Sequence, residues 1–186
     1  MLTLTTPLRD VKSLRAGDEV GINGVIYTAR DAAHQRLVKL IAEGKPLPFP
    51  VEGSIIYYVG PTPAKPGEPI GSAGPTTSVR MDGLTIPLLE QGLKGMIGKG
   101  GRSPHVIEAM KEHGAVYFAA VGGAAALIAQ SIKEVEVIAY PELGAEAVHR
   151  MVVENFPVIV AIDSEGNNLY EQGVATYRDP SLKEAK

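Results

Sequence analysis

The spacing of apolar residues along the chain predicts short strands that alternate irregularly with short helices. Strands are predicted at residues 2–6, 19–28, 54–59, 95–97, 116–121, 134–139 and 157–162. Helices are predicted at about 29–43, 83–93, 104–112 and 123–131, the first because Ala33, Leu37, Leu40 and Ile41 repeat at helical spacing. This mixture indicates an α/β or α+β fold without a clean alternation of elements.

Turn and capping residues predict where several of these elements end. Asn23-Gly24 is a turn signal that should interrupt the second strand. Thr28 and Asp31 are typical of a capping pair at the start of the first helix. Ser103-Pro104 predicts a helix start, with serine as the cap and proline in the first turn, where its missing N–H is harmless.

The remaining segments are predicted to be loops. Residues 60–75 are dense in glycine and proline, and an ordered loop is favoured over a linker because the apolar pattern resumes without a charge run. Residues 163–168, DSEGNN, predict a hairpin turn, and the chain after Tyr177 is polar. A length of 186 residues suits one domain, which we place at 1–177, followed by a polar tail at 178–186.

Composition excludes several classes of protein. Hydrophobic residues make up 45%, so the chain is not intrinsically disordered, and a net charge of −3 argues against a dedicated nucleic-acid binder. The absence of cysteine excludes disulfides and an iron–sulfur cluster held by this chain alone. Four scattered histidines make a weak case for zinc. The N-terminal segment has no long apolar run, so we expect a cytoplasmic protein.

Four cationic residues lie in segments suited to binding an anion. Arg30 comes at the start of the first predicted helix, and Arg102 comes just before the helix that begins at Ser103-Pro104. Cations are unfavourable at a helix N-terminus unless an anion neutralises them. Arg80 follows a Gly-Pro loop and Lys99 lies in GKGG. A ligand with two carboxylates would suit this set, because guanidinium groups bind carboxylates bidentately.

Each of these residues also has an ordinary structural explanation. Arg30 could be a solvated surface charge neutralised by Asp31, and His34 a packing residue. Thr76, Thr77 and Asp82 could be turn or cap residues, and GKGG a tight turn between a strand and a helix. The hypothesis of an anion site therefore depends on the combination rather than on any single residue.

The stretch MIGKGGRSPHVIEAM also resembles the GXXG loop of KH domains, in which glycines let the backbone clamp nucleic-acid phosphates. A KH loop joins two helices, whereas residues 95–97 are predicted to be a strand. The chain also has no basic surplus. RNA binding through Lys99 and Arg102 is therefore the weaker alternative.

Five segments resemble one known family in matching order: TARDAAHQR (28–36), SIIYYVGPT (54–62), GSAGPTTSVRMD (71–82), MIGKGGRS (96–103) and FPVIVAIDSEGNNLY (156–170). They are similar to the beta subunit of two-subunit class I fumarate hydratases, equivalent to the C-terminal domain of the single-chain forms. The related L-tartrate dehydratase beta subunit shares much of GPTTSxRM. Arg102-Ser103 looks fumarase-like, but Ser78-Val79 departs from the Ala-Gly more common in fumarases. L-tartrate and mesaconate therefore remain alternative substrates.

The resemblance implies an α/β fold, a swivelling β/β/α domain with a mixed central sheet and short flanking helices. It implies an alpha subunit whose cysteines hold a [4Fe–4S] cluster, a beta–beta homodimer contact, and no metal bound by this chain. Position by position, it implies that Arg30, Arg80 and Lys99 hold the substrate carboxylates and that Thr76 is the catalytic base. The further candidates Asp31, His34, Thr77 and Arg102 lie in the same motifs without assigned roles.

The implied reaction, reversible addition of water to fumarate to give (S)-malate, explains this set of residues. Removal of the C3 proton of malate produces a carbanion-like species, whose developing charge cations on the adjacent carboxylate would stabilise. A Lewis-acid iron would help the hydroxyl leave. A threonine hydroxyl is a poor base, so Thr76 would need activation by a neighbouring group.

Overall fold

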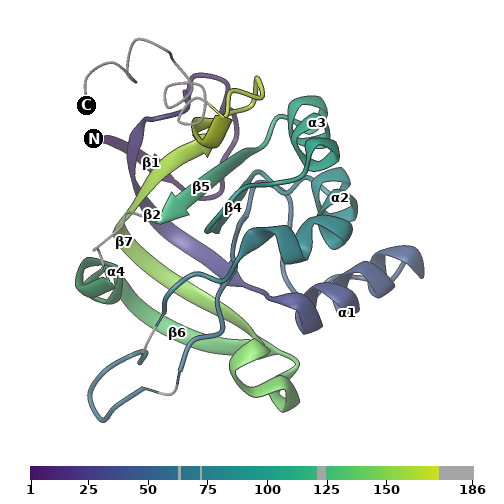
Figure 1. The fold of residues 1–186 in the computed structure, drawn as a ribbon. Coiled ribbons are helices and arrows are strands. Elements are labelled where there is room, and N and C mark those ends of the chain that lie inside the picture. The colour runs from purple at the N-terminus through teal and green to yellow at the C-terminus, as the bar shows by residue number, and fades with distance from the viewer. Residues whose placement is uncertain (63, 72, 121–124, 172–186) are drawn as a thin grey trace, which may run out of the picture.

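A computed structural model describes residues 1–62, 64–71, 73–120 and 125–171, and one seven-stranded sheet runs through them (Figure 1). The strand order is β1-β2-β3-β4-β5-β7-β6. The first five strands pair in parallel, whereas β7 is antiparallel to β5 and β6 and also pairs with β2. The bounds are β1 Leu2–Thr5, β2 Glu19–Thr28, β3 Ile55–Tyr57, β4 Gly95–Gly98, β5 Val116–Ala120, β6 Ile132–Ala139 and β7 Val148–Ile162.

The helices are short and most of them lie on one side of the sheet. In Figure 1, α1 (Asp31–Ala42), α2 (Asp82–Glu90) and α3 (Pro104–His113) lie together, while α4 (Ala125–Ser131) lies apart from them near β6 and β7. Within the described ranges there are also two 3₁₀ helices, η1 (Ser78–Met81) and η2 (Pro141–Glu146). The predicted α/β class, with a mixed central sheet and short helices, is confirmed.

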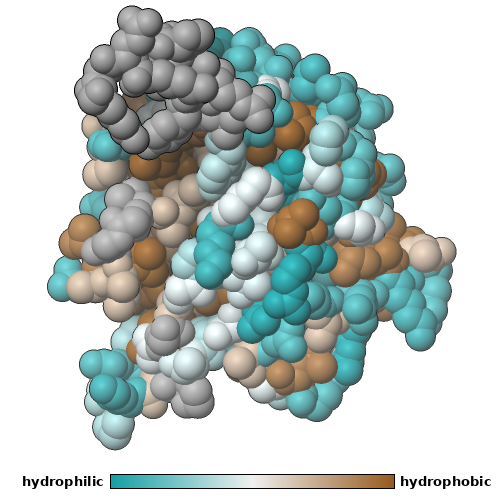
Figure 2. All heavy atoms as spheres, viewed as in Figure 1, coloured by the Kyte–Doolittle hydropathy of each residue, from teal (hydrophilic) through white to brown (hydrophobic). Residues whose placement is uncertain are grey.

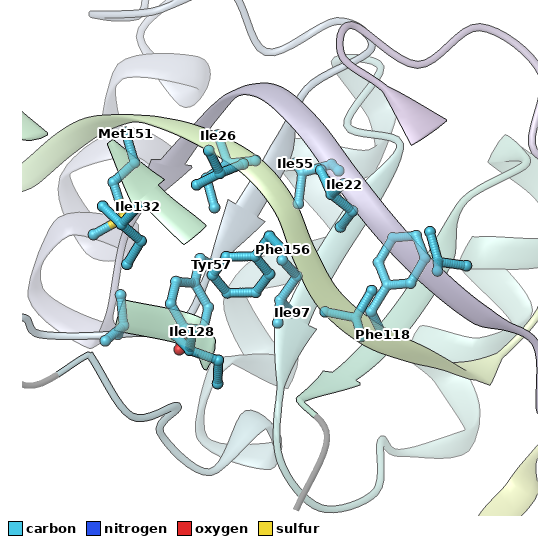
Figure 3. Close-up of a cluster of buried hydrophobic side chains, with 14 of the residues drawn as sticks. Ile22, Ile26, Ile55, Tyr57, Ile97, Phe118, Ile128, Ile132, Met151 and Phe156 are labelled. Atoms are coloured by element: carbon cyan, nitrogen blue, oxygen red, sulfur yellow. The ribbon is translucent and has the colours of Figure 1, made fainter. Parts of the chain in front are cut away.

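Both faces of the central strands are buried, which produces two hydrophobic cores. In β3, Ile55 and Tyr57 belong to one core and Ile56 belongs to the other, because successive strand side chains point to opposite faces. The first core is enclosed by the curved sheet and contains Phe118 and Phe156 (Figure 3). The second core lies between the sheet and α1–α3. Burial on both faces explains why SIIYYV is continuously apolar.

The Asn23-Gly24 signal marks a β-bulge rather than a break in the strand. β2 continues through it, and its register with β7 shifts between Ile22 and Gly24. Gly24 has φ +107°, a conformation that glycine adopts without steric cost. The prediction of a turn at this place was therefore wrong.

The helix positions are confirmed, and Ser103 is the N-cap residue of α3 as predicted, but the predicted capping pair of Thr28 and Asp31 is wrong and neither helix has a side-chain cap bond. Arg30 occupies the N-cap of α1 without a side-chain cap bond, and the Thr28 hydroxyl instead lies 3.1 Å from Nδ1 of His149. Ser103 makes no side-chain cap bond to α3 either, and its backbone N–H donates to Oδ2 of Asp82 at 2.7 Å. Pro104 occupies the first turn as predicted.

The last described strand is longer than predicted. β7 begins at Val148, whereas the predicted strand began at residue 157. The prediction missed the first part of the strand because polar residues such as Glu154 and Asn155 interrupt the apolar alternation. At residues 163–168 the turn is confirmed, with Oδ1 of Asp163 accepting the backbone N–H groups of Glu165 and Asn167. A single bridge between Ile162 and Asn168 follows it. The predicted polar tail at 178–186 lies outside the described residues. Across the described ranges, every helix is too short or too polar to cross a membrane.

Candidate functional site

The candidate residues follow neighbouring parallel strands. Arg30 comes two residues after β2, Gly60 follows β3, and Lys99 follows β4 directly. Since these strands are parallel and adjacent, their carboxyl ends meet at one edge of the sheet. This edge is where open α/β sheets bind their ligands.

The segment that carries Thr76 and Thr77 lies against Lys99. The Ser78 N–H donates to the Lys99 carbonyl at 2.9 Å, and the Lys99 N–H reaches the Thr76 carbonyl at 3.4 Å. Thr77 and Lys99 form a parallel β-bridge, and the Thr76 N–H donates to the Tyr58 carbonyl at 2.7 Å. Segments more than twenty residues apart in sequence are therefore joined by backbone hydrogen bonds.

Arg80 and Asp31 form an ion pair that connects η1 to the start of α1. Their Nη2 and Oδ2 atoms are 2.9 Å apart, and the Arg80 side chain is 54% exposed. The second carboxylate oxygen, Oδ1 of Asp31, is buried and has no hydrogen-bond partner within the described residues. Asp31 thus fixes an exposed guanidinium beside the helix that begins after Arg30.

Arg30 is less exposed than Arg80. Its side chain is 26% exposed, and its Nε lies 3.9 Å from Oε1 of Glu146, a long ion pair rather than a hydrogen bond. Its guanidinium passes so close to Gly60 that a Cβ at that position would lie 2.9 Å from Nη1 of Arg30. Glycine at position 60 therefore makes room for the arginine.

His34 is a neutral buried residue beneath this edge. Its Nδ1 lies 2.8 Å from the Arg30 carbonyl, which requires the proton to be on Nδ1. Burial lowers the pKa of His34 to about 4, although the hydrogen bond to Arg30 opposes that shift. Its Nε2 is buried without a hydrogen-bond partner among the described residues, and its ring packs edge-on to Tyr58.

Arg102 lies inside the protein rather than at the surface of the site. Its Nε donates to Oδ1 of Asp82 at 2.7 Å, its Nη1 to the Tyr58 hydroxyl at 3.0 Å and its Nη2 to Thr85 at 2.9 Å. Burial opposes the charge, but Tyr58 and Asp82 outweigh it and raise the pKa of Arg102. The anion that neutralises this cation is Asp82, so Arg102 provides no argument for an external ligand.

The structure brings Arg30, Asp31, Thr76, Thr77, Arg80 and Lys99 to one edge and places His34 and Arg102 beneath it. Figure 2 shows strongly hydrophilic residues near the middle of the viewed face, beside residues of intermediate hydropathy. Sequence reasoning did not single out Tyr58 or Tyr117, which support the loops from below. The sequence did not distinguish them, because Tyr58 directly follows β3, Tyr117 lies in β5, and both stand in continuously apolar stretches.

The residues present do not suit a metal or cluster held by this chain alone. The chain has no cysteine, and the described residues contain no group of three or more histidine or acidic side chains that could hold a metal ion. The chemistry that the edge offers is cationic, with hydroxyl groups beside it.

The GKGG loop connects a strand to a helix. It leaves β4 at Gly98 and enters α3 at Pro104. A KH loop would join two helices. The RNA-binding alternative therefore loses its structural basis.

Comparison with known proteins shows which family the chain resembles. A family model described as "Fumarase C-terminus" matches residues 2–173. The "Putative L(+)-tartrate dehydratase subunit beta" of Methanocaldococcus jannaschii is 42% identical over 170 residues, 88% of this chain and 87% of that protein. The anaerobic class I fumarate hydratase of Escherichia coli K12 is 44% identical over 156 residues, which is 82% of this chain but only 28% of that enzyme. Fumarate hydratase 2 of Leishmania major is 41% identical, and the match spans 28% of its length.

Proposed function

This chain belongs to the fumarase C-terminal family, and we propose that it is the beta subunit of a hydro-lyase that reversibly hydrates fumarate to (S)-malate. One observation supports this proposal above the others. Arg30, Arg80 and Lys99 gather with Thr76 at the carboxyl edge of three parallel strands. A dianionic substrate is the ligand that such a set of cations suits.

The proposed roles follow from the chemistry of each group. Arg30 and Arg80 bind carboxylates through paired N–H donors, and Lys99 adds a point charge. These cations stabilise the negative charge that develops when the proton next to a carboxylate is removed. Thr76 is the candidate base, with Thr77 beside it. A hydroxyl needs a neighbouring group to act as a base, and Lys99, which forms a bridge with the adjacent Thr77, is one candidate on this chain.

We further propose that the rest of the site comes from a separate alpha subunit. The fumarate hydratases that the chain matches are about three times its length, since the match covers only 28% of each. A cysteine-bearing alpha subunit would hold the [4Fe–4S] cluster that this chain cannot ligate. The complex would be cytoplasmic, with a contact between two beta subunits.

L-tartrate is the second candidate substrate. The Methanocaldococcus jannaschii relative, named for tartrate, matches this chain over 87% of its own length and is of similar size. In that case the same cations would bind the two carboxylates of L-tartrate. The two substrates differ in hydroxylation and not in charge, so the cationic edge does not discriminate between them.

Reconstitution tests both the subunit role and the substrate. The chain is purified alone and together with the cysteine-bearing partner, under anaerobic conditions with iron and sulfide, and turnover of fumarate, (S)-malate and L-tartrate is measured. We expect turnover only with the partner, and faster with fumarate and malate than with L-tartrate. Turnover by the chain alone without iron would overturn the subunit proposal, and exclusive turnover of L-tartrate would establish the second candidate.

A further inference from the structure

We propose that Tyr117 is a positioning residue whose buried hydroxyl holds the segment that carries Thr76 against the loop that carries Lys99. Tyr117 lies on β5 and is fully buried. Its hydroxyl is 2.7 Å from Oγ of Ser78, two residues after Thr76, and donates to the Gly100 carbonyl at 2.8 Å, one residue after Lys99. The kinetic consequence depends on the proposed function, but the contact itself does not.

The hydrogen atoms of this contact can be assigned. A carbonyl only accepts, so the bond to Gly100 uses the one hydrogen of the Tyr117 hydroxyl, and Ser78 then donates to Tyr117. Burial raises the pKa of Tyr117, so the hydroxyl keeps that hydrogen at neutral pH. The two segments are therefore joined by buried side-chain bonds as well as by their backbone bonds.

Gly98 makes this contact sterically possible. A Cβ built at Gly98 would overlap the Ser78 hydroxyl and would lie 2.9 Å from Cδ2 of Tyr58. Gly98 ends β4, which lies between β3 and β5 in the sheet. Only a residue without a side chain lets the Ser78 hydroxyl pass over β4 to reach Tyr117 on β5.

Arg102 holds the Tyr117 ring in place. Its guanidinium lies 5.2 Å from the centre of the Tyr117 ring and 5.1 Å from that of Tyr58, distances at which a cation attracts an aromatic face. The Tyr58 backbone carbonyl in turn accepts the Thr76 N–H. The buried cation thus supports both rings on which the site segments rest. This gives Arg102 a positioning role through Tyr117 and Tyr58, without contact with substrate.

Hydrogen exchange in the full chain tests the contact directly. The Ser78 and Lys99 amides bond to Lys99 and Thr76 across the two segments, so their exchange reports the separation of the segments. We expect Tyr117→Phe to speed exchange at both amides about fivefold, the effect of losing one net hydrogen bond. Tyr27→Phe is the matched control, because it removes a hydroxyl from a buried ring that stacks on Phe49 outside this network. Equal exchange in Tyr117→Phe, Tyr27→Phe and wild type would overturn the contact.

Steady-state kinetics of the reconstituted complex test the positioning role. We expect Tyr117→Phe to lower kcat/KM about tenfold, since small misplacements of catalytic groups are costly. Its thermal midpoint should fall by no more than a few degrees, as for one lost hydrogen bond. Faster exchange with unchanged kcat/KM would overturn the positioning role. If wild type shows no turnover with its partner, the proposed function fails while the exchange measurement still decides the contact.

Ser78→Ala provides a second variant in case Tyr117→Phe unfolds. It removes the donor to Tyr117 and leaves the Tyr117–Gly100 bond in place. If the hydroxyl contact is real, Ser78→Ala alone should speed exchange at the amide of residue 78, and unchanged exchange would overturn the contact. Where Tyr117→Phe folds, the double variant should speed exchange at that amide no more than Tyr117→Phe alone. Fully additive effects would contradict a shared bond.

Discussion

At the scale of single residues, the burial of His34 should make the stability of the chain depend on pH. In the folded chain its pKa is about 4, whereas its ordinary value is 6.5. Between these values the unfolded chain binds a proton that the folded chain does not, so stability falls as pH falls from 6.5 towards 4. We expect the free energy of unfolding to be lower by about 2 kcal/mol at pH 5 than at pH 7 from this residue.

Urea unfolding at the two pH values measures this difference. His34→Gln should remove most of it, because glutamine does not titrate. Some slope should remain, since burial also lowers the pKa of His149. A difference of the same size in His34→Gln and wild type would show that His34 is not its source.

Substitution of Arg80 should impair substrate binding without unfolding the chain. Its side chain is half-exposed and pairs with Asp31, so Arg80→Ala should cost about 1 kcal/mol of stability or less. We expect the same change to reduce kcat/KM of the reconstituted complex at least a hundredfold, because a carboxylate partner is lost. Circular dichroism and steady-state kinetics measure the two effects.

Arg36→Ala is the matched control for Arg80→Ala. Arg36 is also a partly exposed arginine, paired with Glu142, but it lies further along α1. It should lose similar stability and retain turnover. Comparable loss of turnover in both variants would remove the special role of Arg80.

At the scale of elements, the buried pair of Arg102 and Asp82 joins α2 to the start of α3. Asp82 binds the Arg102 side chain through one oxygen and the Ser103 N–H through the other. Arg102→Leu should therefore lower the free energy of unfolding by about 3–5 kcal/mol, because it leaves a buried carboxylate unpaired.

Chemical denaturation of single and double variants tests this prediction. Changing Asp82 to Leu as well should recover part of the loss, because the unpaired charge is removed with its partner. If the losses of the two single changes simply add in the double variant, the two residues do not act as a pair.

The elements were predictable where the apolar pattern is regular and local. The positions of α1, α3 and β3 follow from spacing and from Pro104. The bulge at Gly24 and the early start of β7 were not predictable, because both depend on pairing between strands far apart in the chain. The buried position of Arg102 was not predictable either, because its partners Tyr58 and Asp82 come from distant parts of the chain. The order of the motifs indicated which residues lie near the edge, but it did not indicate that His34 and Arg102 lie beneath it.

At the scale of the whole molecule, assembly should cover the cationic edge. Lys99 is exposed in the single chain. We expect its side-chain amine to be protected from acylating reagents in the complex with the partner and a dicarboxylate, while other exposed lysines, such as Lys39 of α1, remain reactive. Mass spectrometry of labelled peptides measures this. Equal labelling of Lys99 in the chain alone and in the complex would place the partner elsewhere.

The long strand β7 has a consequence for synthesis on the ribosome. It pairs with β2, β5 and β6, so it closes a sheet whose other members precede it in the chain. The cationic edge and its supporting tyrosines are all translated before Val148. A nascent chain therefore carries all the site residues that this chain contributes while β2, β5 and β6 still lack their pairing with β7. Until Ile162 has left the exit tunnel, this intermediate is the species that chaperones would need to protect from aggregation.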